Sequence, residues 1–525
     1  MNGTHTSFCN VCGRNSHLRK FCHLCKFLVT VDDEKFTTTT KGVPHRVLIF
    51  NYIERLLNEH YFDQDIQINN VVIYPRYEGG FGDIIFGYKT YNLIKSQVTP
   101  NVIIYTDDKT AKFFEALDIN IPIFTSNIPE FYQNADINLL TPTTKLYTQR
   151  KIKGKFNIEI HEYVGFRHKD SLRESFESRC GYRTDAGLSF DSIGIFIEKD
   201  TSRFNKFNNL SFLRFFNTYL SSSKLFFGYV SQYNMSSSYI QLILQFHNHG
   251  YYGNINNIAI CTRYHDDDVV DINWKNQNFI KYASANGYNV RIIFDYKLYP
   301  NNSYESFNPN NTKTLTILNV KGILYEDVQH LLYLSDPFVF ITGDQSLSDA
   351  ISLNKRFIYE ALGHKRELYN SLYVLVDLLN LSQIKQLWLT LLPPTYISKF
   401  ILPNIIDNTY LQTVYNLIYN HTEFNVLNSF IRENFDIETN LIGMMKRFKT
   451  YFNNPEQIHH DYDFIIDLLQ GIDLSEYTIQ IIQNYFEFIT LIFDKCKTGQ
   501  ELPDNFPQTQ FYNQMMRPYK DLLYV

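Results

Sequence analysis

Short apolar runs alternate with stretches of helical periodicity over residues 70 to 370, and this alternation constrains the fold more than any other feature. Helical patterns lie between most of the runs, for example at residues 237–246 and 279–286. Such alternation is typical of parallel α/β sheets. The span is too long for one small domain, so we predict two α/β halves. The predicted strands are residues 71–74, 101–105, 193–197, 225–229, 257–261, 290–294, 314–317, 338–341 and 357–359.

The flanking segments differ from this pattern. Residues 31–45 are polar and predict a linker, which a helix over residues 47–60 follows. A polar connection near residues 201–209 marks the border between the halves, so we predict them at 46–205 and 206–374. Beyond residue 375 the strand signal fades and apolar periodicity remains, which predicts a mostly helical region over 375–525.

Composition narrows the class of protein. The 525 residues are 44% hydrophobic and 20% charged, as in an ordinary globular protein. The net charge of −5 disfavours a nucleic-acid partner. The sequence contains no uninterrupted apolar stretch of about 18 residues, so we do not expect a transmembrane helix. No signal peptide precedes the first cysteine. We therefore expect a protein of the cytoplasm, or one secreted into a host cytosol without a classical signal peptide.

Four cysteines near the N-terminus form two Cys-x-x-Cys pairs: Cys9 with Cys12, and Cys22 with Cys25. Four thiolates satisfy the tetrahedral coordination of zinc, and paired spacing is more specific than a single pair. The alternatives are incidental pairs or a redox dithiol. We predict a zinc ribbon over residues 1–30. Its zinc is structural, because four protein ligands leave no open position for catalysis.

A glycine loop follows the predicted strand at 71–74. It contains Gly79, Gly80 and Gly82, then Asp83, and a helical pattern comes next. Glycines let the backbone pass close to a ligand, and the N-terminus of a helix favours anions. We predict that Asp83 lies beside a substrate at the mouth of the sheet. The alternative is a tight turn in which Asp83 is only the N-cap.

A second strand–glycine–helix turn follows the strand at 338–341. Amides near Ser346 would point at a phosphate or pyrophosphate, and the carboxylate of Asp349 would meet a ribose diol. The alternative is a capping box from Ser346 to Asp349. The turn comprises Gly343, Asp344, Gln345, Ser346, Leu347, Ser348 and Asp349.

Residues 343–350 resemble the nucleotide-sugar signature of GT-B glycosyltransferases, and residues 79–83 resemble the Gly-Gly-x-Gly-Asp loop of that family's N-terminal half. The resemblance implies two Rossmann-like halves, with the pyrophosphate on the second turn and the ribose on Asp349. Bacterial heptosyltransferases and the arginine rhamnosyltransferase carry comparable Gly-Asp loops. In the latter an aspartate is the general base, which points to Asp83.

The resemblance therefore implies a metal-independent glycosyltransferase with a nucleotide-diphosphate sugar as donor. Arg263, just after the strand at 257–261, could meet the diphosphate, and the alternative is a surface or structural arginine. His364, Lys365 and Arg366 could add charge near the same site. The ribbon and the helical region would recognise a protein acceptor, as in a bacterial effector. Two alternatives stay open. One is a zinc-ribbon interaction protein that binds nucleotide without turnover, and the other is a metal held by Asp266 and Asp268.

Overall fold

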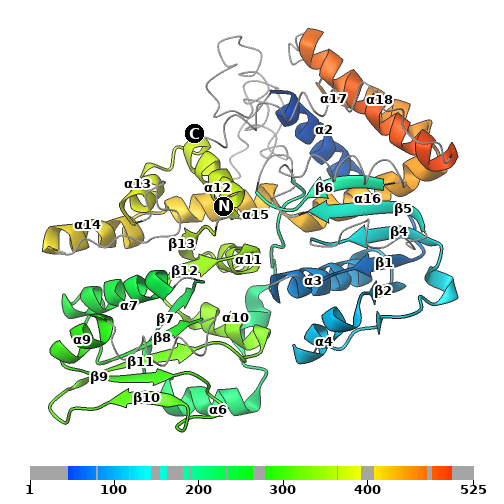
Figure 1. The fold of residues 1–525 in the computed structure, drawn as a ribbon. Helices are drawn as coiled ribbons and strands as arrows, with labels where there is room; N and C mark the ends of the chain where they lie inside the picture. The colour runs from blue at the N-terminus through cyan, green and yellow to red at the C-terminus, as the bar shows by residue number, and fades with distance from the viewer. Residues whose placement is uncertain are drawn as a thin grey trace, which may run out of the picture. The chain divides into compact units, whose positions relative to one another are not determined.

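The computed structural model describes residues 45–77, 81–117, 119–142, 154–161, 181–188, 192–231, 233–263, 278–362, 365–391, 407–469 and 476–498. Its contacts divide the chain into two compact units (Figure 1). Unit 1 contains the described residues up to Phe196 and those from Glu433 onward, and unit 2 runs from Ile197 to Arg432. The predicted zinc ribbon, with its four cysteines, and most of the linker lie outside the described residues.

Unit 1 is built on six parallel strands in the order β3-β2-β1-β4-β5-β6. This is the strand order of a Rossmann sheet: successive strands are added on one side of β1 up to β3, and from β4 onward they are added on the other side. The strands are β1 (Val71–Tyr74), β2 (Val102–Tyr105), β3 (Ile123–Phe124), β4 (Ala135–Leu140), β5 (Gly154–His161) and β6 (Gly181–Asp185). The helices are α2 (His45–Phe62), α3 (Phe81–Gln97), α4 (Asp108–Ala116), η3 (Glu130–Tyr132), α16 (Ile437–Asn453), α17 (Gln457–Leu469) and α18 (Glu476–Thr498).

Both faces of β1 are covered, as an apolar strand without polar alternation requires. Val71 and Ile73 belong to a large core that also contains residues of α2, α3, α16 and α18. Val72 and Tyr74 belong to a smaller core on the other face. Each of these four residues is at most 1% exposed, which fixes β1 at the centre of the sheet.

The C-terminal helix α16 packs closely on the N-terminal helix α2. A Cβ at Gly443 would lie 1.9 Å from the backbone oxygen of Asn58, so glycine alone permits this approach. Nearby, the buried guanidinium of Arg447 bonds Glu54 at 2.6 Å and the hydroxyl of Tyr485 at 2.8 Å. Helices at both ends of the chain therefore complete the core of unit 1.

Unit 2 is built on seven strands in the order β10-β9-β11-β8-β7-β12-β13, all parallel except β10. Helices α7 and α9 lie on one face of the sheet, and α10 and α11 lie on the other (Figure 1). The strands are β7 (Lys224–Tyr229), β8 (Asn257–Thr262), β9 (Tyr288–Ile293), β10 (Ser303–Ser306), β11 (Lys313–Asn319), β12 (Phe338–Thr342) and β13 (Arg356–Glu360).

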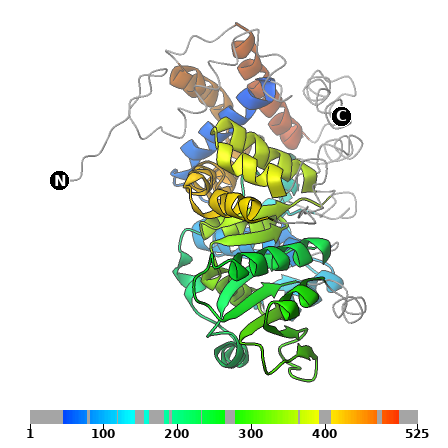
Figure 2. The ribbon, with the colours of Figure 1, turned by 90° about the vertical axis from the view of Figure 1, so that its left-hand side faces the viewer.

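Helices α12, α13 and α14 pack in succession after the last strand of unit 2 (Figure 2). The predicted α/β fold of two parallel sheets with C-terminal helices is thus confirmed, and those helices are shared between the two units. The helices of unit 2 are η6 (Thr201–Asn205), α6 (Leu210–Tyr219), α7 (Tyr233–Asn248), α9 (Asn278–Ala285), α10 (Tyr325–Leu334), α11 (Asp344–Ser352), α12 (Arg366–Leu378), α13 (Ser382–Leu391), α14 (Asn408–Tyr419) and α15 (Glu423–Asn434).

The predicted strand at 193–197 was wrong. This segment joins neither sheet and makes an isolated bridge from Ile195 to Asp436. Gly194 has a φ of +102°, outside the extended range of a strand, and a Cβ there would lie 2.2 Å from the backbone oxygen of Phe435. The segment is apolar because Ile193 and Ile195 are buried, although it is not a strand. Among the described residues, no helix is both long and apolar enough to cross a membrane.

Candidate functional site

The carboxyl edge of the unit 2 sheet brings three strand ends into a row. Gly228 of β7 is in register with Thr262 of β8, and Tyr229 is in register with Ile341 of β12. Arg263, the residue after β8, therefore lies beside the end of β7, which itself neighbours β12. Ligands of open α/β sheets bind at this edge, where the order of the strands reverses.

The side chain of Arg263 folds over the end of β7. Its Nη1 donates a hydrogen bond to the hydroxyl of Tyr229, and its guanidinium carbon lies 5.1 Å from the centre of that ring. A cation over an aromatic face is held by the quadrupole of the ring. Arg263 is half-buried and keeps donors beyond the one that Tyr229 uses. Tyr229 was not identified from the sequence. It holds the positive charge of Arg263 at the end of β7, in the middle of the carboxyl edge of the sheet.

Gly343 joins β12 to α11 and is the N-cap of that helix, with φ 78° and ψ 159°. A Cβ there would meet nothing within 4 Å, so the position favours glycine for its backbone and not for space. No side chain caps the helix, and its first backbone N–H groups have no partner within the helix. Such an N-terminus favours anions.

Lys365 brings a second cation to the first turn of α11. Its Nζ lies 2.7 Å from Oδ2 of Asp344, and only 7% of the lysine side chain is exposed. The other oxygen of Asp344, Oδ1, is buried and has no hydrogen-bond partner among the described residues. An acceptor without a donor costs free energy, which a ligand hydroxyl would recover. The predicted residues Gly343 and Asp344, together with Lys365 from beyond β13, thus lie at one end of α11.

Asp349 lies deeper in the same helix and is 4% exposed. Its carboxylate accepts hydrogen bonds from the hydroxyl of Tyr325 at 2.8 Å, from Gln329 at 3.0 Å and from Gln345 at 2.9 Å. Two of these donors come from α10, so the carboxylate fastens α11 to α10. Tyr325 and Gln329 are four residues apart on one helix face, a spacing that sequence reasoning did not use. The ribose role of Asp349 stays a prediction.

The remaining residues of the turn differ in accessibility. Gln345 and Ser346 are half-buried, whereas Leu347 and Ser348 are buried. The backbone N–H of Leu347 donates to the carbonyl of Gly343, 3.2 Å away, and so closes the first turn of the helix. If a ligand reaches this turn, it meets the backbone and the side chains of Gln345 and Ser346 before it meets the other two.

In unit 1, Asp83 lies in the first turn of α3, because that helix begins at Phe81. Asp83 is therefore not the N-cap, and it is 8% exposed. Gly79 and Gly80 lie outside the described residues, and a Cβ at Gly82 would meet nothing within 4 Å. The glycine that packs tightly is Gly87, whose Cβ would lie 2.8 Å from the side chain of Pro75 at the end of β1.

The residues of the predicted zinc site, and those of the alternative metal site, lie outside the described parts of the chain. They are the four cysteines and the loop that contains Asp266 and Asp268. Within the part of the chain that the structure describes, no group of three His, Cys, Asp or Glu side chains could hold a metal ion.

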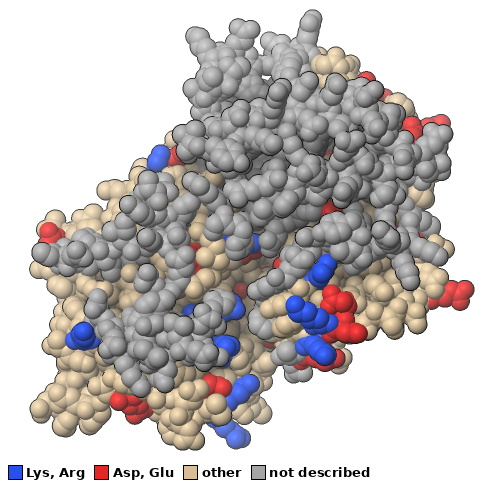
Figure 3. All heavy atoms as spheres, viewed as in Figure 1, with Lys and Arg blue, Asp and Glu red and all other residues tan. Residues whose placement is uncertain are grey.

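Figure 3 shows one face of the molecule in charge colours. On the described surface of that face, Lys and Arg side chains are interspersed with Asp and Glu. No continuous basic band runs over the described residues in this view.

No protein-family model matches the sequence, and no curated protein sequence matches it. Several solved structures have a similar fold at low identity. The N-terminal domain of Candida albicans trehalose-6-phosphate phosphatase is 10% identical with a TM-score of 0.36, covering 77% of this chain and 97% of that one. A family 9 glycosyl transferase from Veillonella parvula is 10% identical with a TM-score of 0.31, covering 56% and 82%.

An O-GlcNAc transferase variant from Thermobaculum terrenum is 8% identical with a TM-score of 0.30, covering 92% of this chain and 80% of that one. At such TM-scores a likeness carries no functional argument. The chemistry of the site must therefore be judged from the residues of this chain.

Proposed function

We propose that this protein is a GT-B glycosyltransferase that moves a sugar from a nucleotide-diphosphate sugar to an acceptor. One observation carries the proposal. The carboxyl edge of the unit 2 sheet gathers an uncapped helix N-terminus at Gly343 with the cations Arg263 and Lys365. A diphosphate needs such an environment both for binding and for leaving.

The leaving diphosphate gains negative charge as its bond to the sugar breaks. Arg263 donates to its oxygens in a fixed fork, and the first amides of α11 donate along the helix axis. Lys365 adds charge while it neutralises Asp344, so the carboxylate does not repel the ligand. We propose that these groups supply the charge stabilisation and that the reaction is metal-independent.

Asp344 and Asp349 are proposed to recognise the hydroxyl groups of the donor. Oδ1 of Asp344 has no donor among the described residues, so a sugar or ribose hydroxyl would satisfy it. Asp349 already accepts three side-chain donors, and a ribose diol would add to them. Gln345, Ser346 and the backbone of the turn would contact the phosphates.

Asp83 is proposed as the general base. The acceptor forms a bond to the anomeric carbon as the bond from that carbon to the diphosphate oxygen breaks, and the proton of the acceptor passes to the carboxylate. Asp83 lies in the first turn of α3, the helix that follows β1, and the strand order of unit 1 reverses between β1 and β4, where ligands bind in such sheets. Gly79, Gly80 and Gly82 are proposed to let the acceptor or donor approach the backbone of this turn.

The four N-terminal cysteines are proposed to hold one structural zinc ion. The ribbon would recognise a protein acceptor, as in an effector-type enzyme. Elemental analysis of the purified full chain should give one zinc per chain, and the Cys22→Ser variant should lose it. A wild-type protein without zinc would contradict the proposal.

A panel of nucleotide-diphosphate sugars tests the function. The correct donor should raise the melting temperature by mass action, since it binds only the folded state. The same donor should release its nucleoside diphosphate when acceptor is supplied. The second candidate, a nucleotide-binding interaction protein, is favoured by the holding role of Asp349 between two helices. It predicts stabilisation by the donor with no release of diphosphate under any acceptor condition.

A further inference from the structure

A cavity of about 490 Å³ lies within unit 2, at the turn from α11 into β13. This turn is at the amino edge of the sheet, opposite the edge that carries Arg263 and Gly343. The volume is in the range of small-molecule sites. The lining residues are Ile197, Glu198, Lys199, Thr201, Tyr333, Ser352, Leu353, Asn354, Lys355 and Arg432.

The charges that line the cavity are unequal. Three are basic, from Lys199, Lys355 and Arg432, and one is acidic, from Glu198. Lys199 is exposed and Arg432 is half-buried, so these two lie nearer to solvent than Lys355, which is 6% exposed. Three basic side chains of different exposure therefore line the cavity.

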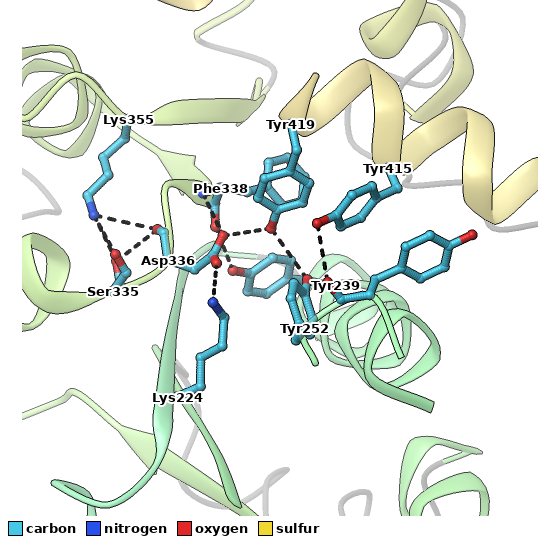
Figure 4. A network of polar contacts seen from close by, with 10 residues as sticks. Lys224, Tyr239, Tyr252, Ser335, Asp336, Phe338, Lys355, Tyr415 and Tyr419 are labelled. Carbon is cyan, nitrogen blue, oxygen red and sulfur yellow. Dashed lines mark hydrogen bonds and ion pairs between the residues drawn. The ribbon is translucent and has the colours of Figure 1, made fainter. Parts of the chain in front are cut away.

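Lys355 is a buried cation for which the described part of the chain offers no anionic partner within ion-pair distance. Its Nζ lies 2.7 Å from the carbonyl oxygen of Ser335, 3.4 Å from the hydroxyl of Ser335 and 3.5 Å from the carbonyl oxygen of Asp336 (Figure 4). It also lies 3.3 Å from the carbonyl oxygen of Tyr333, and all these acceptors are neutral. No carboxylate among the described residues forms an ion pair with it. Buried charges in proteins are normally paired, because desolvation is costly.

The neighbouring carboxylate, Asp336, is engaged elsewhere. It forms an ion pair with Lys224 at 3.0 Å and accepts the hydroxyl of Tyr419 at 2.6 Å (Figure 4). Burial lowers the pKa of Lys355 to about 8, and the more distant charge of Asp336 opposes this shift. Within the described residues, Lys355 thus feels the charge of Asp336 but forms no ion pair with it.

We propose that this cavity binds a small phosphate-bearing anion, either inorganic phosphate or a phosphate monoester, through Lys199 and Arg432. The N–H groups of Lys355 are taken up by neighbouring oxygens, so Lys355 attracts the anion by its charge. Tyr333 and Thr201 give the cavity an aromatic face and a hydroxyl for the remainder of an ester. The site is separate from the proposed donor site, so neither proposal depends on the other.

The position of the cavity suggests what the anion does. Ile197 and Arg432 are the first and last residues of unit 2, so Lys199 lies on the segment that leads into the unit and Arg432 on the helix that leads out of it. An anion held by both side chains would tie these segments together. Hydrogen exchange of residues 197–201 should accordingly slow when phosphate is added.

Calorimetry with inorganic phosphate on the full-length protein tests the proposal. Wild type should bind, and Lys199→Gln combined with Arg432→Gln should weaken binding at least about tenfold, the scale of lost charged hydrogen bonds. Lys281→Gln, an exposed lysine of α9, is the matched control and should change nothing. The same titration with phenyl phosphate and with phenol separates an ester site, which binds the first and not the second, from a site for free phosphate alone.

Arg263→Ala distinguishes the two anion sites of unit 2. If phosphate binding is lost in Arg263→Ala but kept in the double variant, the phosphate binds at the carboxyl edge and the proposal is wrong. It is equally wrong if wild type does not bind phosphate at millimolar concentration, or if the double variant binds it as wild type does. Circular dichroism of each variant confirms folding.

Discussion

The two glycine turns look alike in sequence but use their glycines differently. In unit 2, Gly343 has a φ of 78°, and a Cβ there would meet nothing within 4 Å. Glycine is therefore favoured at this position by its backbone conformation and not by a lack of space. In unit 1, a Cβ at Gly82 would also meet open space, and the close contact belongs to Gly87 against Pro75. A glycine-rich motif therefore marks a strand-to-helix turn without saying which glycine is constrained or why.

The acidic residues of the two turns differ as well. Asp349 and Asp83 are buried to a similar extent, at 4% and 8% exposure. Asp349 accepts three side-chain donors and fastens two helices together. Burial alone thus does not distinguish a carboxylate that fastens two helices from one that could accept a proton.

The largest effect is expected for Asp83→Asn. Loss of a general base slows transfer by roughly 10²–10⁴-fold, whereas the amide keeps the size of the side chain. Sugar transfer and melting temperature should be measured together, and the melting temperature should change little. Asp108→Asn is the matched control, since Asp108 also lies in the first turn of a helix after a unit 1 strand but is exposed. Full activity in Asp83→Asn would end the base assignment.

Gly343→Ala should lower the free energy of unfolding by about 1–3 kcal/mol, because an L-residue is strained at this φ. Gly82→Ala should be neutral or slightly stabilising. Gly82 lies in α3, where alanine is a better helix former than glycine, and the added Cβ would meet nothing within 4 Å. Urea denaturation of both variants compares the two turns directly. Equal losses would contradict the different roles given to the two glycines.

Lys355 should make stability depend on pH in alkaline solution. Its pKa is about 8 in the folded protein and 10.5 for an ordinary lysine, so between these values the unfolded chain binds more protons. The free energy of unfolding should therefore rise with pH over this window, relative to a Lys355→Met variant. Below pH 8 the difference between the two proteins should be constant. Parallel curves over the whole range would show that Lys355 is not perturbed.

The smallest effect is expected for Tyr325→Phe. This variant removes one donor from Asp349 while Gln329 and Gln345 remain, so it should cost about 0.5–1.5 kcal/mol of unfolding free energy. Donor affinity should stay unchanged if Tyr325 only holds the carboxylate. A loss of affinity without loss of stability would instead place Tyr325 in contact with the donor.

The fold was predictable where strands are continuously apolar, as in β1, β7 and β12. Strand β4 was missed because Asp136 and Asn138 interrupt its apolar pattern. Both side chains have partners far away in the sequence. Asp136 forms an ion pair with Lys449 of α16 at 2.7 Å, and the side-chain amide of Asn138 donates a hydrogen bond to Asn157 of β5 at 2.8 Å. Such polar core residues cannot be interpreted before the tertiary contacts are known.

The candidate site was predictable in its turns but not in its contacts. The sequence placed Gly343 and Arg263 after predicted strands, and both were expected near the diphosphate of the donor. It did not show that Tyr229 holds Arg263, or that Asp344 draws Lys365 to the helix. These pairs join residues 34 and 21 positions apart, and only the strand order brings them together.

Calorimetric titration of UDP, GDP and dTDP into wild type, Arg263→Ala and Arg214→Ala tests the central claim most directly. Arg214 is an exposed arginine of α6 and serves as the control. We predict that at least one diphosphate binds wild type and Arg214→Ala equally, and binds Arg263→Ala roughly 10–100-fold more weakly, the scale of lost charged hydrogen bonds. Equal affinity for all three proteins, or no binding of any diphosphate, would contradict a donor site at the carboxyl edge of the unit 2 sheet.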